Sequence, residues 1–304
     1  MRIVSLLPSA TEIVYALGLG DELAGVTYEC DHPPEARTKP VVSTTALPTG
    51  HGLSPREIDD AVRERMELKE PIYRLDTGLI QRIQPDVILA QDLCRVCAVP
   101  SGQVQDALDR LGVQAKVLSL DPNTLQDILG TIGAVGELLG RRDRAEELVA
   151  GLRGRIEAVR RTALRLPSIR VLALEWSDPP FAGGHWVPEM VEVAGGTNVL
   201  SEKGESSRRV TWRQVADATP EVIVFMPCGY YLDEAEEELP GLYANPDFAA
   251  TPAAREGAVF AVDASSYFSR PGPRIVDGLE ILAWAVHPKA YPEPPRGTIA
   301  RVRR

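Results

Sequence analysis

Residues 84–89 read Gln-Pro-Asp-Val-Ile-Leu, and residues 219–224 read Thr-Pro-Glu-Val-Ile-Val. Both stretches place a turn-forming proline before a short apolar run, which is typical of a buried strand in a parallel sheet. A cysteine follows each stretch a few residues later, Cys94 after the first and Cys228 after the second. This weak internal repeat predicts two similar α/β lobes.

The segments around the two stretches alternate between strand and helix patterns. Ser9 and Glu12 have the spacing of a helix capping box, and Gly18 is placed to end that helix. Such alternation predicts a mostly parallel sheet that is covered on both faces. The expected strands are 3–7, 23–26, 87–89, 117–120, 169–174, 222–224 and 259–262, and the expected helices include 101–111, 187–194 and 273–286.

Two further helices are expected between the lobes, at 124–139 and 143–165. The second is charged on most faces, which favours a solvent-exposed connector. We therefore predict an α/β fold of two Rossmann-like lobes, each with a central, mostly parallel sheet, joined by one long helix. The predicted parts are an N-terminal lobe at 1–122, a helical connector at 123–165 and a C-terminal lobe at 166–304.

The composition limits the classes of partner. The 304 residues include 33 Lys and Arg against 43 Asp and Glu, for a net charge of −10. A nucleic-acid partner is not expected, because phosphate neutralisation requires clustered basic residues. No apolar run approaches the ~20 residues of a membrane span. We expect a monomer that does not span a membrane.

The first residues do not have the pattern of a secretory signal. Pro8, Ser9, Thr11 and Glu12 interrupt the apolar stretch that such a signal requires. As encoded, the chain is expected to be cytoplasmic. A periplasmic or cell-surface location is expected instead if the sequence is that of a trimmed mature chain.

Chemically distinctive residues follow the ends of the expected strands. Ligands of parallel α/β sheets lie beyond the carboxyl ends of the strands, so these residues are the candidate binding site. Aromatic residues on loops of the second lobe suit a large ligand with flat or apolar faces, although they could equally plug the interface between lobes. The candidates are Ser9, Glu29, Cys30, His32, Gln91, Cys94, Cys97, Glu175, Trp176, Phe181, His185, Cys228, Tyr267, Phe268 and Arg270.

The cysteines leave several chemistries open. Cys94 and Cys97 have the spacing of half a zinc site, and thiolates suit zinc or iron. A redox pair is less expected, because Ala-Val-Pro follows Cys97 instead of a helix start. Reduced structural cysteines and disulfides are further alternatives. A metal site would combine the pair with the remaining candidates, which are Cys30, Cys228, His32 and His185.

Catalytic motifs are lacking in the sequence. No Gly-x-Gly-x-x-Gly follows a strand, and neither a phosphate loop nor Gly-x-Ser-x-Gly is found. Glu29, Glu175 and Glu189 are better explained as solvated or ion-paired side chains than as paired catalytic carboxylates. We predict that the chain is not an enzyme and assign no catalytic residue or enzymatic cofactor.

Several motifs, taken together and in order, resemble one family along nearly the whole chain. The family is that of solute-binding proteins of the cobalamin and iron-siderophore type, which serve ABC importers. The motifs are Arg2-Ile3-Val4-Ser5-Leu6-Leu7-Pro8-Ser9-Ala10-Thr11-Glu12, Asp31-x-Pro33-Pro34, Pro85-Asp86-Val87-Ile88, Pro179-Pro180-Phe181, Val191-x-x-x-Gly195-Gly196 and Arg270-x-x-Pro273-Arg274.

The resemblance implies two α/β lobes joined by a rigid helix, with a ligand clasped between them. The implied ligand is cobalamin or a related metal-bearing macrocycle, with iron-siderophore and haem as alternatives, and a metal-binding protein or metal-dependent enzyme as a second class. A Cys or His residue could be an axial ligand of the macrocycle's metal. The implied contacts to the ligand's faces are Trp176, Phe181, Tyr267 and Phe268, and those to its polar rim are Glu29, His32, Gln91 and Arg270.

The chain departs from the family pattern at several positions. Leu93 and Ser207 stand where cobalamin binders have bulky aromatic residues. Gln103 and Arg213 stand where the family presents acidic residues to the arginines of an ABC permease. Together with the missing signal segment, these departures point to a cytoplasmic branch of the family and leave the permease partner open.

Overall fold

The structure is a computed structural model of the chain, and it describes residues 1–48, 52–93 and 99–302. The chain forms two compact units, and the backbone passes from one to the other three times. Unit 1 comprises Met1–Pro122 and Gly130–Val149, and unit 2 comprises Asn123–Leu129 and Ala150–Arg304.

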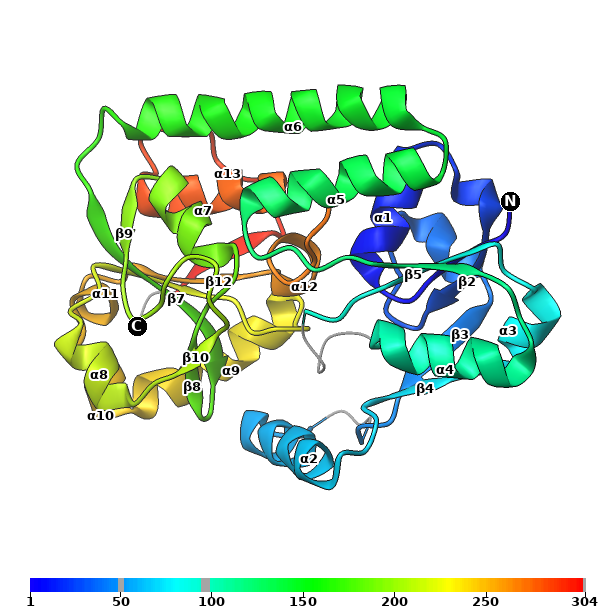
Figure 1. The fold of residues 1–304 in the computed structure, drawn as a ribbon. Coiled ribbons are helices and arrows are strands. Elements are labelled where there is room, and N and C mark those ends of the chain that lie inside the picture. Colours follow the sequence, from blue (N-terminus) through cyan, green and yellow to red (C-terminus); the bar gives the residue numbers. More distant parts are fainter. Residues whose placement is uncertain (49–51, 94–98, 303–304) are drawn as a thin grey trace. The chain divides into compact units, whose positions relative to one another are not determined.

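Unit 1 is built on a sheet with the strand order β4-β3-β2-β1-β5-β6, in which only β4 runs antiparallel to its neighbour. The strands β1 and β5 are buried along their whole length, as their continuous apolar sequences predict. In Figure 1 the elements of unit 1 are coloured from blue to green. Their bounds are β1 Ile3–Ser5, α1 Pro8–Ala16, β2 Leu23–Thr27, β3 Val41–Thr45, α2 Pro55–Leu68, β4 Tyr73–Leu75, α3 Thr77–Ile83, β5 Val87–Ala90, α4 Ser101–Leu111 and β6 Lys116–Ser119, with short 3-10 helices at Gly20–Glu22 and Pro34–Thr38.

The start of α1 differs from the predicted capping box. The helix begins at Pro8 after Leu7, and no side chain caps it. Proline is favoured at the first helical position because its φ is already helical and its missing N–H needs no partner. Ser9 and Glu12 consequently lie inside the helix and are buried. The prediction that Gly18 follows the helix is confirmed by its left-handed φ of 75°.

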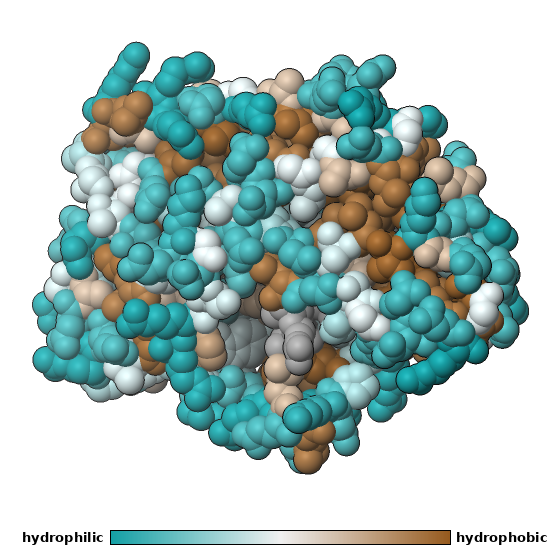
Figure 2. All heavy atoms as spheres, in the orientation of Figure 1, coloured by the Kyte–Doolittle hydropathy of each residue, from teal (hydrophilic) through white to brown (hydrophobic). Residues whose placement is uncertain are grey.

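Helix α2 is the least buried helix of unit 1. Its start is a capping box, in which the Glu57 N–H donates to Ser54 Oγ and Glu57 accepts from the Ser54 N–H. Hydrophilic side chains cover most of α2 in Figure 2, and the apolar side chains of Met66 and Leu68 are also exposed. Only Pro55 of this helix is buried.

Unit 2 is built on a second sheet, with the order β10-β8-β7-β11-β12-β13 and with β9 also paired to β7. The central strands β7, β11 and β12 are parallel, whereas β8 and β13 run antiparallel to their partners. The bounds are β7 Ile169–Ser177, β8 Pro180–Ala182, α7 Val187–Val193, β9 Gly196–Asn198, β10 Arg208–Arg209, α8 Trp212–Asp217, β11 Val222–Phe225, α9 Leu232–Ala244, α10 Pro246–Ala249, α11 Pro252–Arg255, β12 Val259–Val262, α12 Ala264–Tyr267, α13 Ile275–Val286 and β13 Ile299–Val302.

The internal repeat of the sequence has the same structure in both units. In unit 1, Asp86 accepts a hydrogen bond from the Arg2 N–H at 2.6 Å, and the Asp86 N–H donates to Arg2 O at 2.8 Å. In unit 2, Glu221 accepts from the Arg170 N–H at 2.9 Å, and the Glu221 N–H donates to Arg170 O at 2.8 Å. The carboxylate after each proline therefore aligns the two central strands, β1 with β5 and β7 with β11. The predicted fold of two similar, mostly parallel α/β lobes is confirmed.

Two helices belong to both units. They are α5, Leu125–Leu138, and α6, Arg142–Ala163. Gly136 of α5 lies so close to α6 that a Cβ atom there would meet the Ala145 Cβ at 2.3 Å. Among the described residues, no helix is both long and apolar enough to cross a membrane.

Candidate functional site

In unit 1, two of the predicted site residues are already engaged in the interior. Gln91 directly follows β5, and its side-chain N–H donates to Leu120 O at 3.1 Å. Ser9 is buried in the first turn of α1. The Gln91 side chain thus links the segments that follow β5 and β6.

Cys30 lies at the end of a buried chain of polar groups. Its Sγ is 3.0 Å from the Thr11 hydroxyl, which in turn donates to Ser5 Oγ at 2.9 Å. Cys30 is buried and forms no disulfide. The neighbouring Glu29 accepts from the Tyr28 hydroxyl at 3.2 Å, and His32 is exposed.

Two aspartates brace the segment that follows β5. Asp121 Oδ1 accepts from the N–H groups of Asp92 and Leu93 at 2.6 and 2.7 Å, and Asp92 accepts from the Ser101 N–H at 2.8 Å. Both aspartates follow strand ends, which is the signal that could have found them. Cys94 and Cys97 lie outside the described residues.

In unit 2, Glu175 has an unusual environment near the end of β7. Burial raises the pKa of Glu175, and hydrogen bonds from Ser207 and the Gly184 backbone oppose that rise. Its Oε2 is buried and has no hydrogen-bond partner within the described part of the chain. The environment therefore favours the protonated carboxyl over the carboxylate.

Aromatic side chains of the candidate site lie on a strand hairpin. Trp176 of β7 pairs with Phe181 of β8, so the prediction that these rings lie on loops is wrong. The Pro179-Pro180 sequence is compatible with a tight reversal into a short antiparallel strand. The Tyr230 ring meets Trp176 edge-on at 5.4 Å, and the Arg209 guanidinium lies 5.4 Å from the centre of the Phe181 ring.

The remaining aromatic candidates divide into buried and half-exposed groups. Phe268 is 2% exposed, and its carbonyl accepts from the Trp186 indole N–H at 3.0 Å. Tyr267 is half-buried, with the Arg274 guanidinium 5.7 Å from its ring centre. Arg270 is buried. Phe268 and Arg270 thus lie in the interior, whereas Tyr267 is partly open to solvent.

His185 and Cys228 are the other candidates of unit 2. His185 Nδ1 lies 3.2 Å from Asn123 Oδ1, and partial burial lowers the pKa of this histidine. The Cys228 side chain is exposed, and its backbone N–H donates to Glu175 O at 3.2 Å.

Over the described ranges, no three His, Cys, Asp or Glu side chains gather in a way that could hold a metal ion. The predicted metal ligands fall into separate groups. Cys30 and His32 belong to unit 1, and His185 and Cys228 belong to unit 2. The Cys and His metal site stays a prediction, and elemental analysis of anaerobically purified protein tests it.

The family model described as "Periplasmic binding protein" matches residues 3–265. The chain belongs to this family of periplasmic binding proteins. The resemblance drawn from the sequence motifs is thereby confirmed. The family is one of binding proteins and not of enzymes.

Relatives within the periplasmic binding protein family cover most of the chain. An uncharacterized ABC transporter substrate-binding lipoprotein, YvrC of Bacillus subtilis, is 24% identical over 96% of this chain and 82% of its own length. The vitamin B12-binding protein of Vibrio cholerae is 25% identical over 92% of this chain and 86% of its own length. The chain is thus similar to both relatives over nearly its whole length.

A solved structure of similar architecture is the periplasmic heme-binding protein RhuT from Roseiflexus sp. RS-1 in its apo form. It is 26% identical, with a TM-score of 0.70, over 95% of this chain and 98% of that protein. Relatives thus include proteins named for vitamin B12 and for heme, both of which are metal-bearing tetrapyrroles.

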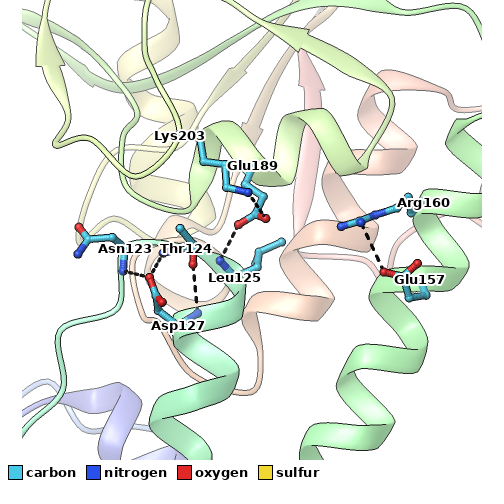
Figure 3. Close-up of polar contacts among 8 residues, drawn as sticks. All are labelled: Asn123, Thr124, Leu125, Asp127, Glu157, Arg160, Glu189 and Lys203. Carbon is cyan, nitrogen blue, oxygen red and sulfur yellow. Dashed lines mark hydrogen bonds and ion pairs between the residues drawn. The ribbon is translucent and has the colours of Figure 1, made fainter.

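The sequence did not predict how the start of α5 is held in unit 2. Glu189 of α7 accepts a hydrogen bond from the Leu125 N–H at 2.8 Å, at the start of α5, and it pairs with Lys203 at 2.6 Å (Figure 3). Thr124 and Asp127 satisfy other N–H groups of the same helix end. The sequence indicated only that Glu189 would be solvated or ion-paired, and the structure pairs it with Lys203.

Proposed function

We propose that this periplasmic binding protein binds cobalamin or a closely related metal-bearing tetrapyrrole as the substrate of an ABC transporter. The observation that carries the proposal is the aromatic group of unit 2, made of Trp176, Phe181 and Tyr230. Rings of this kind offer flat, apolar surfaces with a polar edge, which suit the faces of a large macrocycle.

The relatives support the choice of ligand class. One is named for vitamin B12 and another for heme, and the two ligands share a flat ring system around a metal ion. The relatives named for vitamin B12 and for heme match this chain about equally, at 25% identity over 92% and 26% identity over 95% of it, and cobalamin is taken as the leading ligand because the sequence motifs resemble the cobalamin type. Haem and iron-siderophores are the competing ligands.

The polar rim of the ligand is assigned to polar side chains of the candidate site. Arg270 and Tyr267 are the proposed contacts in unit 2, and Glu29 and His32 are those in unit 1. Gln91 and Phe268 are still predicted to contact the ligand, although their hydrogen bonds within the protein give them a supporting role as well.

The partner implied by the family is an ABC permease. Gln103 lies on α4, and Arg213 lies on α8 with its charge paired to Asp217 at 3.1 Å. We propose that docking on a permease does not use acidic residues at these two positions. The monomeric state and the compartment stay predictions.

The proposal is tested by titrating the full chain with aquocobalamin, hemin and a ferric siderophore, followed by visible absorbance and thermal unfolding. A ligand at 100 times its Kd stabilises the folded state by about 2.7 kcal/mol, which gives a readily measured rise in Tm. We expect the largest rise with aquocobalamin. If none of the three ligands changes the Tm or the absorbance at excess concentration, the proposal is wrong.

A further inference from the structure

His185 has a backbone conformation that few non-glycine residues adopt. Its φ is 54°, in the left-handed region. The segment after β9 holds it there, because the His185 N–H donates to Glu205 O at 2.5 Å and the His185 carbonyl accepts from the Gly204 N–H at 2.9 Å. Such strain persists where surrounding structure enforces it, and it is common at ligand-binding positions.

The imidazole ring is fixed by an amide from the segment before α5. Nδ1 of His185 lies 3.2 Å from Asn123 Oδ1, and an amide oxygen only accepts hydrogen bonds. The Nδ1 atom therefore carries the proton, and the lone pair is on Nε2. The Trp186 ring supports the imidazole at 5.8 Å between ring centres, with an angle of 31° between the planes.

The Nε2 atom of His185 is accessible. In the described ranges it has no hydrogen-bond partner, and it is not among the buried polar atoms that lack one, unlike Nε2 of His287. Metal-binding histidines usually donate their other ring N–H to an oxygen acceptor, which fixes the tautomer and orients the ring. His185 has this arrangement with Asn123 as the acceptor.

We propose that Nε2 of His185 is an axial ligand of the metal ion in the bound tetrapyrrole. The inference rests on the proposed function. In aquocobalamin, the Nε2 lone pair forms a bond to cobalt, the cobalt–oxygen bond breaks, and the displaced water leaves as water with no change of oxidation state. Partial burial keeps the imidazole neutral, as coordination requires.

Cys228 is the competing ligand in unit 2. Its thiol is exposed, but within the described part of the chain no hydrogen bond orients its Sγ atom. The His185 ring, in contrast, is held by a hydrogen bond, by an aromatic neighbour and by a constrained backbone. Preorganised ligands lose less freedom on binding, so His185 is the stronger candidate.

The test compares two forms of one ligand on the full chain. Aquocobalamin has an exchangeable water on cobalt, whereas cyanocobalamin holds a cyanide in that position. We expect the visible spectrum of aquocobalamin to shift on binding and that of cyanocobalamin to stay unchanged. We expect His185→Gly to abolish the shift and to weaken aquocobalamin binding by more than about tenfold, with little effect on cyanocobalamin.

Glycine is chosen because it adopts a left-handed φ without strain, so the variant is expected to fold. Added imidazole should restore tight aquocobalamin binding to His185→Gly. Because free imidazole itself coordinates aquocobalamin, the affinity and not the spectral shift is the readout of this rescue. Asn123→Ala should weaken aquocobalamin binding by about tenfold through loss of ring orientation.

The outcomes separate the two ideas. If the wild-type chain binds neither cobalamin form nor hemin, the proposed function is wrong. If both cobalamin forms bind without a spectral shift, or if His185→Gly weakens both equally, the proposed function stands and the axial role of His185 is refuted.

Discussion

The carboxylate of Glu189 is expected to determine the stability of the contact between α5 and α7 in unit 2, and Glu189→Ala tests this. Glu189 accepts from the Leu125 N–H at 2.8 Å and from Lys203 Nζ at 2.6 Å. Its side chain is 12% exposed, whereas that of Lys203 is 45% exposed. The two interactions therefore differ in how much solvent screens them.

The expected cost follows from the separate contributions. A buried N–H that loses its acceptor costs about 1–3 kcal/mol, and the loss of a negative charge at a helix N-terminus costs about 0.3–1 kcal/mol. The half-exposed ion pair with Lys203 adds at most about 1 kcal/mol. We expect Glu189→Ala to lower the free energy of unfolding by about 3 kcal/mol, and Glu189→Gln, which keeps an acceptor, by about 1 kcal/mol.

Thermal unfolding and amide hydrogen exchange provide the measurements. For a domain of 150–250 residues, 1 kcal/mol shifts the Tm by roughly 2–4 °C, so Glu189→Ala should lower the unit 2 transition by about 6–12 °C. Exchange at the Leu125 amide should accelerate in the same variant. Glu192→Ala is the matched control, because Glu192 is exposed on the same helix and should leave both readouts unchanged.

Two results would contradict this reasoning. One is a loss below about 0.5 kcal/mol for Glu189→Ala, which is within the range of ordinary surface substitutions. The other is a cost for Lys203→Met equal to that of Glu189→Ala, since it would place the stability in the ion pair and not in the helix end.

Three further predictions concern charged groups. Because the pKa of Glu175 is raised in the folded state, the protonated carboxyl stabilises the fold fully below the ordinary Glu pKa, and this stabilisation is lost as the pH rises through the folded-state pKa. Glu175→Gln should therefore raise the Tm at neutral pH and should give no such gain in acid. Asp86→Ala and Glu221→Ala should each lower the midpoint of urea unfolding, because each removes a carboxylate that accepts from a strand N–H; a loss confined to one of them would contradict the structural repeat. Arg155→Met should cost only about 1 kcal/mol, since Arg155 and its two carboxylate partners are well exposed, and the loss should shrink in high salt.

Local patterns predicted the fold because the decisive signals are short in range. The proline and the carboxylate that precede β5 and β11 lie next to the strands they align, so a short stretch of sequence was enough to recognise the repeat. The start of α1 was misplaced by two residues, because the capping-box spacing of Ser9 and Glu12 competed with the preference of Pro8 for the first helical position.

The site was less predictable because it depends on pairs that are distant in sequence. Glu189 and Leu125 are 64 residues apart, and His185 and Asn123 are 62 residues apart. No local periodicity encodes such partners. The sequence placed Trp176 and Phe181 among aromatic residues on loops, whereas the structure pairs them across the hairpin of β7 and β8.

The division of the chain between the units also has a consequence during synthesis. Unit 1 is not complete at Pro122, since it includes Gly130–Val149, which emerge only after the first turn of α5. The Leu125 N–H in that first turn has no Glu189 carboxylate to accept its hydrogen bond until α7 has been synthesised. Unit 1 therefore cannot finish folding until the chain has been made through Val149, and a gene cut at residue 122 should leave its N-terminal piece without the last part of that unit.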